Sequence, residues 1–176
     1  MKTFEELVEL LKNKFTGETD IEARKEGAED VILVNPSLIK DVATFLASEE
    51  ALKFDSLILL SGADDENGEK IKNEDESIDI KGGTLSVYYH IESTSLVHKL
   101  TLRVSVDREN PLTQSVESIW RCADWHEREA FDLYGIIFEG HPNLKRILMP
   151  YDWEFGYPLR KDYKNPEFYN GMKVPY

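Results

Sequence analysis

The chain has few cysteines, few basic residues and no long apolar run. Cys122 is the one cysteine among 176 residues, so an internal disulfide is excluded and this chain alone cannot ligate an iron–sulfur cluster. Acidic residues number 34 against 21 lysines and arginines, for a formal net charge of −13. This charge repels phosphate backbones and anionic lipid, so we expect no direct binding to nucleic acid or to a membrane surface. The longest apolar runs, such as Leu57–Leu60, are far shorter than the roughly 20 residues of a membrane-spanning helix.

The chain also lacks the motifs of nucleotide and metal sites. It contains no GxGxxG and no GxxxxGK[ST] pattern, so no loop of these kinds can cradle a nucleotide phosphate. His126-Glu127 begins like the helix of a zinc protease, but Ala130 stands where the second histidine ligand is required. Glu127 and Glu129 point about 200° apart on a helix, which prevents them from acting together as an acid–base pair. One enzymatic alternative stays open, a free-standing enzyme that uses the acidic cluster of this helix or Cys122 as nucleophile with His126 as its base.

Charge and aromatic residues are unevenly distributed along the chain. Residues 1–80 hold 21 acidic and 9 basic residues, whereas the residues from Gly140 onward hold 4 acidic and 6 basic ones. Thirteen of the 19 aromatic residues lie in the last third of the chain, and five of the seven prolines follow Gly140. We therefore expect an acidic body, residues 1–149, and an extended aromatic and proline-rich C-terminal arm, residues 150–176.

Hydrophobic spacing predicts helices and strands in the body. Residues 3–15 carry apolar side chains at helical spacing, with Thr3 as N-cap and Glu6 three positions later. A second helix is expected after Pro36, with Ser37 as its cap. Expected strands are 31–35, 54–61, 84–92 and 97–107, and the acidic segment 63–79 is expected to be a solvated loop or hairpin end. This order predicts an α+β two-layer sandwich with helices on one face of a mixed four- to five-stranded sheet.

A third helix is predicted over residues 124–134. Asp124 and Glu127 have the spacing of a capping box, and Gly135 is expected to end the helix. Arg128 and Asp132 are four residues apart and are expected to pair.

Glu129 and Asp132 share a face of this helix and would repel each other without a nearby cation. We expect that cation to be Arg121, the Lys145-Arg146 pair or a residue of another chain.

Residues along this helix and after it resemble the signature of a known family. The resemblance rests on Glu127-Arg128-Glu129, Asp132-Leu133-Tyr134, His141, Lys145, Ile147, Leu148 and the segment 156–163. It covers about Ser118 to Tyr163. The pattern resembles the 30 kDa subunit family of respiratory complex I, which in bacteria is the C subunit of NADH-quinone oxidoreductase.

The resemblance implies a non-catalytic structural or assembly subunit in the hydrophilic arm of a proton-pumping NADH-quinone oxidoreductase. This chain would bind no cofactor, since NADH, FMN, iron–sulfur clusters and quinone would lie in partner subunits. The implied partners are the subunits D, B and I of the complex, chiefly the first of these, on the cytoplasmic side of the inner membrane. The alternatives are the equivalent subunit of a membrane-bound hydrogenase or of a ferredoxin-dependent, photosynthetic-type complex, and a homo-oligomeric scaffold.

No catalytic, cofactor-binding or metal-binding residue is expected, and the candidate site is a set of subunit contacts. The arm carries interface-type side chains, namely Tyr151, Trp153, Phe155, Tyr157, Tyr163, Phe168, Tyr169 and Tyr176. We expect it to lie on a partner subunit, with folding over its own sheet as the alternative. The expected interface and network residues are Glu127, Arg128, Glu129, Asp132, His141, Lys145, Arg146, Tyr157, Arg160 and Lys161.

Overall fold

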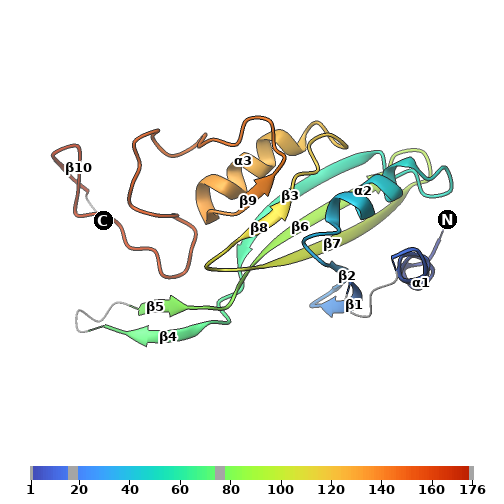
Figure 1. Cartoon of the computed structure of the whole chain (residues 1–176), viewed down its shortest axis with the longest axis horizontal. Coiled ribbons are helices and arrows are strands. Elements are labelled where there is room, and N and C mark those ends of the chain that lie inside the picture. The colour runs from blue at the N-terminus through green and yellow to red at the C-terminus, as the bar shows by residue number, and fades with distance from the viewer. Residues whose placement is uncertain (1, 16–19, 74–77, 175–176) are drawn as a thin grey trace.

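The computed structural model describes residues 2–15, 20–73 and 78–174, and Tyr176 lies outside these ranges. The described residues form three helices and a five-stranded mixed sheet, with three small two-stranded pairs (Figure 1). The elements are α1 (Phe4–Lys14), β1 (Ile21–Glu26), β2 (Glu29–Val34), α2 (Ile39–Ser48), β3 (Ser56–Asp64), β4 (Glu69–Lys72), β5 (Ile78–Lys81), β6 (Thr84–Ser93), β7 (His98–Asp107), β8 (Leu112–Gln114), α3 (Ala123–Tyr134), β9 (Ile137–Glu139), β10 (Phe168–Tyr169) and β11 (Met172–Lys173).

The main sheet has the strand order β1-β2-β7-β6-β3. Its pairs are antiparallel except β2 with β7, where Ile32 lies opposite Leu102 in a parallel register. The long hairpin β6–β7 forms its centre, with Tyr89 opposite Leu102. The predicted α+β class with a mixed sheet is therefore confirmed.

One face of the sheet is apolar and the other is polar. On β6 and β7, the residues Leu85, Val87, Leu102 and Val104 are buried and belong to one hydrophobic cluster. Apolar residues of all three described helices join this cluster, so the helices and the sheet share a single core. On the other face Arg103 pairs with Glu26 and Asp65. Period-two alternation along β7 accounts for this separation.

The capping box of the first helix is confirmed, because the side chains of Thr3 and Glu6 each accept from the other's backbone N–H. Two other cap predictions are wrong. The N-cap of α2 is Leu38 with no side-chain cap bond, and the Ser37 hydroxyl instead donates to Asn35. The N-cap of α3 is Cys122, also without a side-chain cap bond.

The strand predictions hold for β2, β3, β6 and β7 and miss the edge strand β1. The strand β1 was not predicted, because four of its six residues are charged and it is largely exposed. The strand predicted at 54–61 is the edge strand β3, in which Leu57 and Leu60 are buried but Ile58 and Leu59 are 45% and 42% exposed. The acidic segment 63–79 contributes β4 and the start of β5, which pair as a projecting hairpin (Figure 1), and residues 74–77 lie outside the described ranges.

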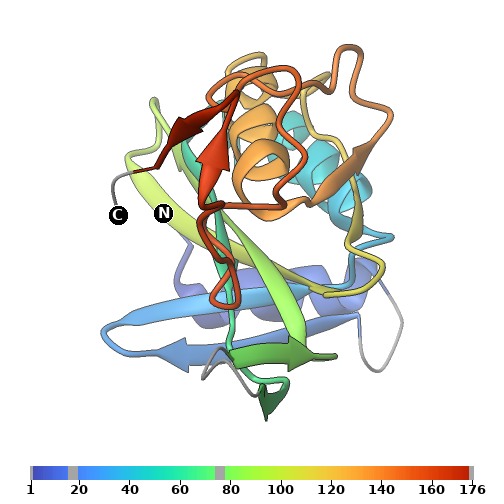
Figure 2. The same cartoon turned by 90° about the vertical axis from the view of Figure 1, so that its left-hand side faces the viewer.

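The segment after Gly140 has little regular structure and passes along α3 in both views (Figures 1 and 2). The Leu159 backbone N–H donates to the Leu133 carbonyl at 3.1 Å, which joins this segment to the end of α3. Within the same segment, the rings of Trp153, Phe155 and Tyr169 pack on one another. Part of the arm therefore lies on the body of the same chain. The division into a body, residues 1–149, and an arm, residues 150–176, stays a prediction.

Candidate functional site

The carboxylate of Asp132, which is fully buried on α3, gathers four donors from the following segment. Its Oδ2 accepts the backbone N–H groups of Ile147, Leu148 and Met149 at 2.9, 2.7 and 2.9 Å. Its Oδ1 accepts Nη1 of Arg146 at 2.8 Å. Burial alone would raise the pKa of Asp132, but these donors outweigh it and hold that pKa below its ordinary value. Asp132 therefore fixes the turn at 146–149 against the helix.

Glu127 is buried on α3 and faces away from that turn. Its carboxylate accepts the Ser115 hydroxyl at 2.6 Å and the Val116 backbone N–H at 2.8 Å. Burial raises the pKa of Glu127 to about 7, and these two bonds only partly offset the effect. Glu127 thus ties α3 to the chain after β8, which explains why it does not cap its own helix.

Arg128 pairs with Asp124, one turn earlier, so the predicted pair with Asp132 is wrong. The distance from Arg128 Nε to Asp124 Oδ1 is 3.3 Å, and His141 Nε2 lies 3.3 Å from the same oxygen. The guanidinium also lies over the Trp125 ring, 4.1 Å from its centroid. Asp132 takes Arg146 as its cation instead. Arg128 and Asp132 therefore belong to separate contact sets.

Gly135 allows the C-terminal segment to approach the end of α3. It ends the helix with φ 76°, and a Cβ at this position would lie 2.5 Å from the Tyr157 ring. The Nε of Arg160 donates to the Tyr134 carbonyl at 2.7 Å. Tyr157 lies close to two guanidiniums, those of Arg160 and Arg146, at 4.6 and 5.5 Å from its centroid. Glycine is required here both for the left-handed backbone and for the close approach.

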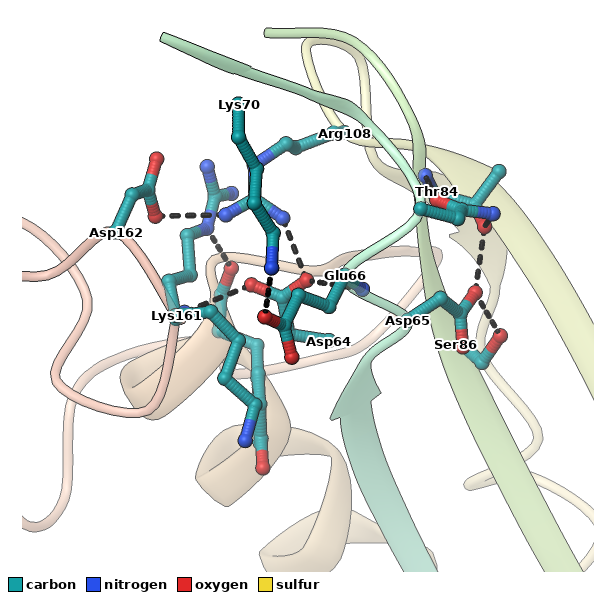
Figure 3. A network of polar contacts seen from close by, with 12 residues as sticks. Asp64, Asp65, Glu66, Lys70, Thr84, Ser86, Arg108, Lys161 and Asp162 are labelled. Atoms are coloured by element: carbon teal, nitrogen blue, oxygen red, sulfur yellow. Dashed lines mark hydrogen bonds and ion pairs between the residues drawn. The ribbon is translucent and has the colours of Figure 1, made fainter. Parts of the chain in front are cut away.

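A second polar network joins the same segment to the sheet (Figure 3). Arg108, only 4% exposed, lies between Asp64 and Asp162, with N–O distances of 2.7 and 2.6 Å. The Lys161 backbone N–H donates to Asp64 at 2.9 Å. Arg108 and Asp64 were not predicted as site residues, because Arg108 follows an ordinary strand, Asp64 ends one, and no motif marks either residue.

The residues predicted for the site fall into several groups. Asp132, Arg146, Tyr157 and Arg160 meet at the end of α3, whereas Arg128 and His141 meet at Asp124. Glu127 faces Ser115, and Lys161 enters through its backbone. Glu129 and Lys145 are exposed, and neither has an ion pair with any described residue.

The geometry gives no support to the Cys122–His126 enzyme. The Cys122 thiol donates to the Leu57 carbonyl at 3.4 Å, and no hydrogen bond joins it to His126 within the described ranges. His126 and Glu129 line a cavity of about 150 Å³ whose other walls are mostly apolar, which is small for a ligand pocket. Residues 2–15, 20–73 and 78–174 contain no group of three His, Cys, Asp or Glu side chains that could hold a metal ion. In the same ranges, no helix has the length and apolar character needed to cross a membrane.

Comparison with known proteins gives consistent matches. The family model described as respiratory-chain NADH dehydrogenase, 30 Kd subunit, matches residues 32–169. The C subunit of the NADH-quinone oxidoreductase of Chloroherpeton thalassium is 47% identical over 136 residues, which are 77% of this chain and 50% of that protein. The protein of the same name from Chlorobium phaeobacteroides is 42% identical over 137 residues, 77% of this chain and 74% of its own length. The chain thus spans about half the length of the first relative and about three-quarters of the second.

Two solved structures are also similar. A trypsin-resistant fragment (1–134) of Nqo5 superposes with a TM-score of 0.57 at 25% identity, covering 80% of this chain and 98% of the fragment. A chain of the membrane-bound sulfane sulfur reductase, an archaeal respiratory membrane complex, gives a TM-score of 0.53 at 19% identity, covering 91% and 85%. The second likeness concerns the fold alone.

Proposed function

The chain belongs to the 30 kDa subunit family of the respiratory-chain NADH dehydrogenase, and we propose that it is a structural subunit of a proton-pumping NADH-quinone oxidoreductase. In this role it contributes rigidity and contacts to the hydrophilic arm and carries no catalytic residue. Electron transfer from NADH through FMN and iron–sulfur clusters to quinone takes place in partner subunits.

The observation that carries this proposal is how the segment after α3 is organised. Asp132 holds its backbone and Arg108 holds the Asp162 side chain, while several of its large apolar side chains stay exposed. Tyr151 is 96% exposed, Leu148 58%, and Met172 66%. Buried charges that hold a segment in place, with aromatic and aliphatic side chains left facing outward, suit a protein interface better than an active site.

The proposed partners are the subunits D, B and I of the complex, with the first as the principal one, and the chain lies peripherally on the cytoplasmic side of the inner membrane. Because the chain's net charge is −13, its association with the membrane is expected to be indirect, through the complex. The alternative is the equivalent subunit of a hydrogenase or ferredoxin-dependent complex, which differs in its electron donor.

Affinity purification of the tagged protein from detergent-solubilised native membranes tests the proposal, with co-purifying chains identified by mass spectrometry. Recovery of quinone-site and iron–sulfur subunits is expected, and the donor-side subunits then distinguish NADH from another donor. Recovery of the protein alone would refute the proposal.

Variants of exposed residues test the interface itself. Tyr151→Ser and Leu148→Ser should reduce recovered complex and change the free energy of unfolding of the isolated protein by no more than about 0.5 kcal/mol. Leu96→Ser is a matched control, since Leu96 is 39% exposed in the β6–β7 turn. Equal complex recovery for all three variants would contradict a partner contact at Tyr151 and Leu148.

A further inference from the structure

Arg128 is a buried cation whose N–H groups donate no hydrogen bond to the described residues. Its side chain is 5% exposed, in the middle of α3. A guanidinium offers five N–H donors, yet none of them donates a hydrogen bond to a described residue, and the buried Nε has only an ion-pair contact. Among the described residues its acidic neighbour is Asp124, which lies 3.3 Å from Nε and equally close to His141.

Arg108 is a second buried arginine, and unlike Arg128 it has hydrogen-bond acceptors for its guanidinium. Arg108 is buried to the same degree, and two carboxylates contact its Nη atoms at 2.7 and 2.6 Å. An arginine removed from water without acceptors is costly, because the lost hydration is not replaced. Nε is the fully buried nitrogen of Arg128, whereas Nη1 and Nη2 have no acceptor among the described residues and remain open to an acceptor from another chain.

Trp125 covers one face of the Arg128 guanidinium and so leaves its edge as the place where an acceptor can bind. Its ring covers one face of the Arg128 guanidinium at 4.1 Å, and 62% of the residue is exposed. With that face covered, the free N–H groups lie in the plane of the guanidinium, where a carboxylate can accept two of them at once. Tryptophan and arginine are also among the residues most enriched at the energetic centres of protein interfaces.

We propose that Trp125 and Arg128 form a docking site for an aspartate or glutamate side chain of a partner subunit. The site rests on the proposed function, since the partner is another chain of the same complex. It lies on α3, the helix that also holds the turn at 146–149 through Asp132, and adds a charge-specific contact to the exposed apolar residues of the C-terminal segment.

The test compares tagged Arg128→Met and Arg128→Lys with Arg121→Met in affinity purification of the intact complex from native membranes. Arg121 is the matched control, because its side chain is 85% exposed and already paired with Glu117. Arg128→Met is expected to lower partner recovery about tenfold or more, since removing one partner of a desolvated charge pair costs at least that factor. Arg128→Lys should also lose recovery, because lysine keeps the charge but not the planar fork. Arg121→Met should match the wild type.

Thermal unfolding of the isolated full chain separates docking from an internal role. Arg128→Met should change the melting temperature only slightly, because the internal contacts that it loses are a 3.3 Å ion pair with Asp124, which His141 also contacts, and the stacking on the exposed Trp125 ring. A fall in melting temperature that parallels the loss of complex would overturn the site, and so would unchanged recovery of partners by Arg128→Met. Failure of the wild type to recover any partner would instead overturn the proposed function, and the site with it.

Photo-crosslinking identifies the occupant. A benzoylphenylalanine in place of Trp125, in the assembled complex, should cross-link to a partner peptide that contains an aspartate or glutamate. Neutralising that acid should reduce recovery as much as Arg128→Met, with little further loss in the double variant. A cross-link within this chain, or to a partner peptide without an acidic residue, would overturn the proposal.

Discussion

Replacing Asp132 by alanine tests whether this one carboxylate holds the C-terminal segment on the body. Asp132 is fully buried and accepts three backbone N–H groups and the guanidinium of Arg146. Its removal leaves one charge and three amide groups without their acceptor. Breaking a buried, hydrogen-bonded ion pair from one side costs about 3–5 kcal/mol. For a chain of this size, that loss corresponds to a fall in melting temperature of about 6–20 °C.

The assay is thermal unfolding of the isolated chain followed by circular dichroism, together with limited trypsin digestion. Trypsin should cleave Asp132→Ala rapidly after Arg146, because the turn at 146–149 is no longer fixed. Glu129→Ala is the control, since Glu129 is exposed on the same helix and should change stability by about 0.5 kcal/mol or less. A variant within about 1 kcal/mol of wild type, with Arg146 still protected, would refute this account of the segment.

The lowered pKa of Asp132 also gives a pH dependence with a definite sign. A carboxyl group whose folded pKa lies below its ordinary value of 3.8 stabilises the protein above about pH 4, and that stability is lost as the pH falls further. The wild type should therefore lose more stability than Asp132→Ala between about pH 4 and about pH 2. Parallel acid-unfolding curves for the two proteins would contradict this.

Three further changes have defined outcomes. Glu127 has a folded pKa of about 7 against an ordinary value of 4.5, so wild-type stability should fall by about 3 kcal/mol as the pH rises from about 4.5 to about 7.5. Glu127→Gln should lack this slope in urea unfolding at several pH values, and an unchanged slope would assign the effect to another group. Arg108→Met leaves buried Asp64 unpaired and should cost about 3–5 kcal/mol in chemical denaturation, much of which Asp64→Asn in the same chain should restore. Gly135→Ala adds a Cβ 2.5 Å from Tyr157 at a positive φ and should destabilise by more than about 1 kcal/mol, whereas Gly27→Ala, with open space around it, should show only the backbone cost.

Local pattern explains the elements that sequence analysis predicted correctly. The alternation along β7, the capping box at Thr3 and Glu6, and the helix end at Gly135 each depend on residues within a few positions of one another. The family resemblance over residues 118–163, confirmed by the family model, also rests on local spacing. These features follow from helical and strand periodicity and from backbone preferences, which any short stretch of sequence contains.

The errors occur where a distant segment decides the outcome. Glu127 has the spacing of a capping residue, but the chain after β8 supplies buried donors that outcompete the helix end. Arg128 and Asp132 have the spacing of a pair, but Arg146 and the turn after it fill the space around Asp132. An i,i+4 pair contributes only a few tenths of a kcal/mol on an exposed helix, so a buried alternative readily replaces it.

Composition and short-range spacing were enough to predict the class of the fold and to show the lack of nucleotide motifs, because both depend on neighbouring residues, and the resemblance to the family signature also rests on a short stretch of sequence. The pairing of charges, by contrast, depends on how distant segments meet. Arg108 and Asp162 are 54 positions apart, and Asp64 and Lys161 are 97 apart, so no local pattern relates them. They are joined because the end of β3, the end of β7 and the C-terminal segment converge at one place (Figure 3). Burial there makes each unpaired charge costly, and this cost selects the pairs that form.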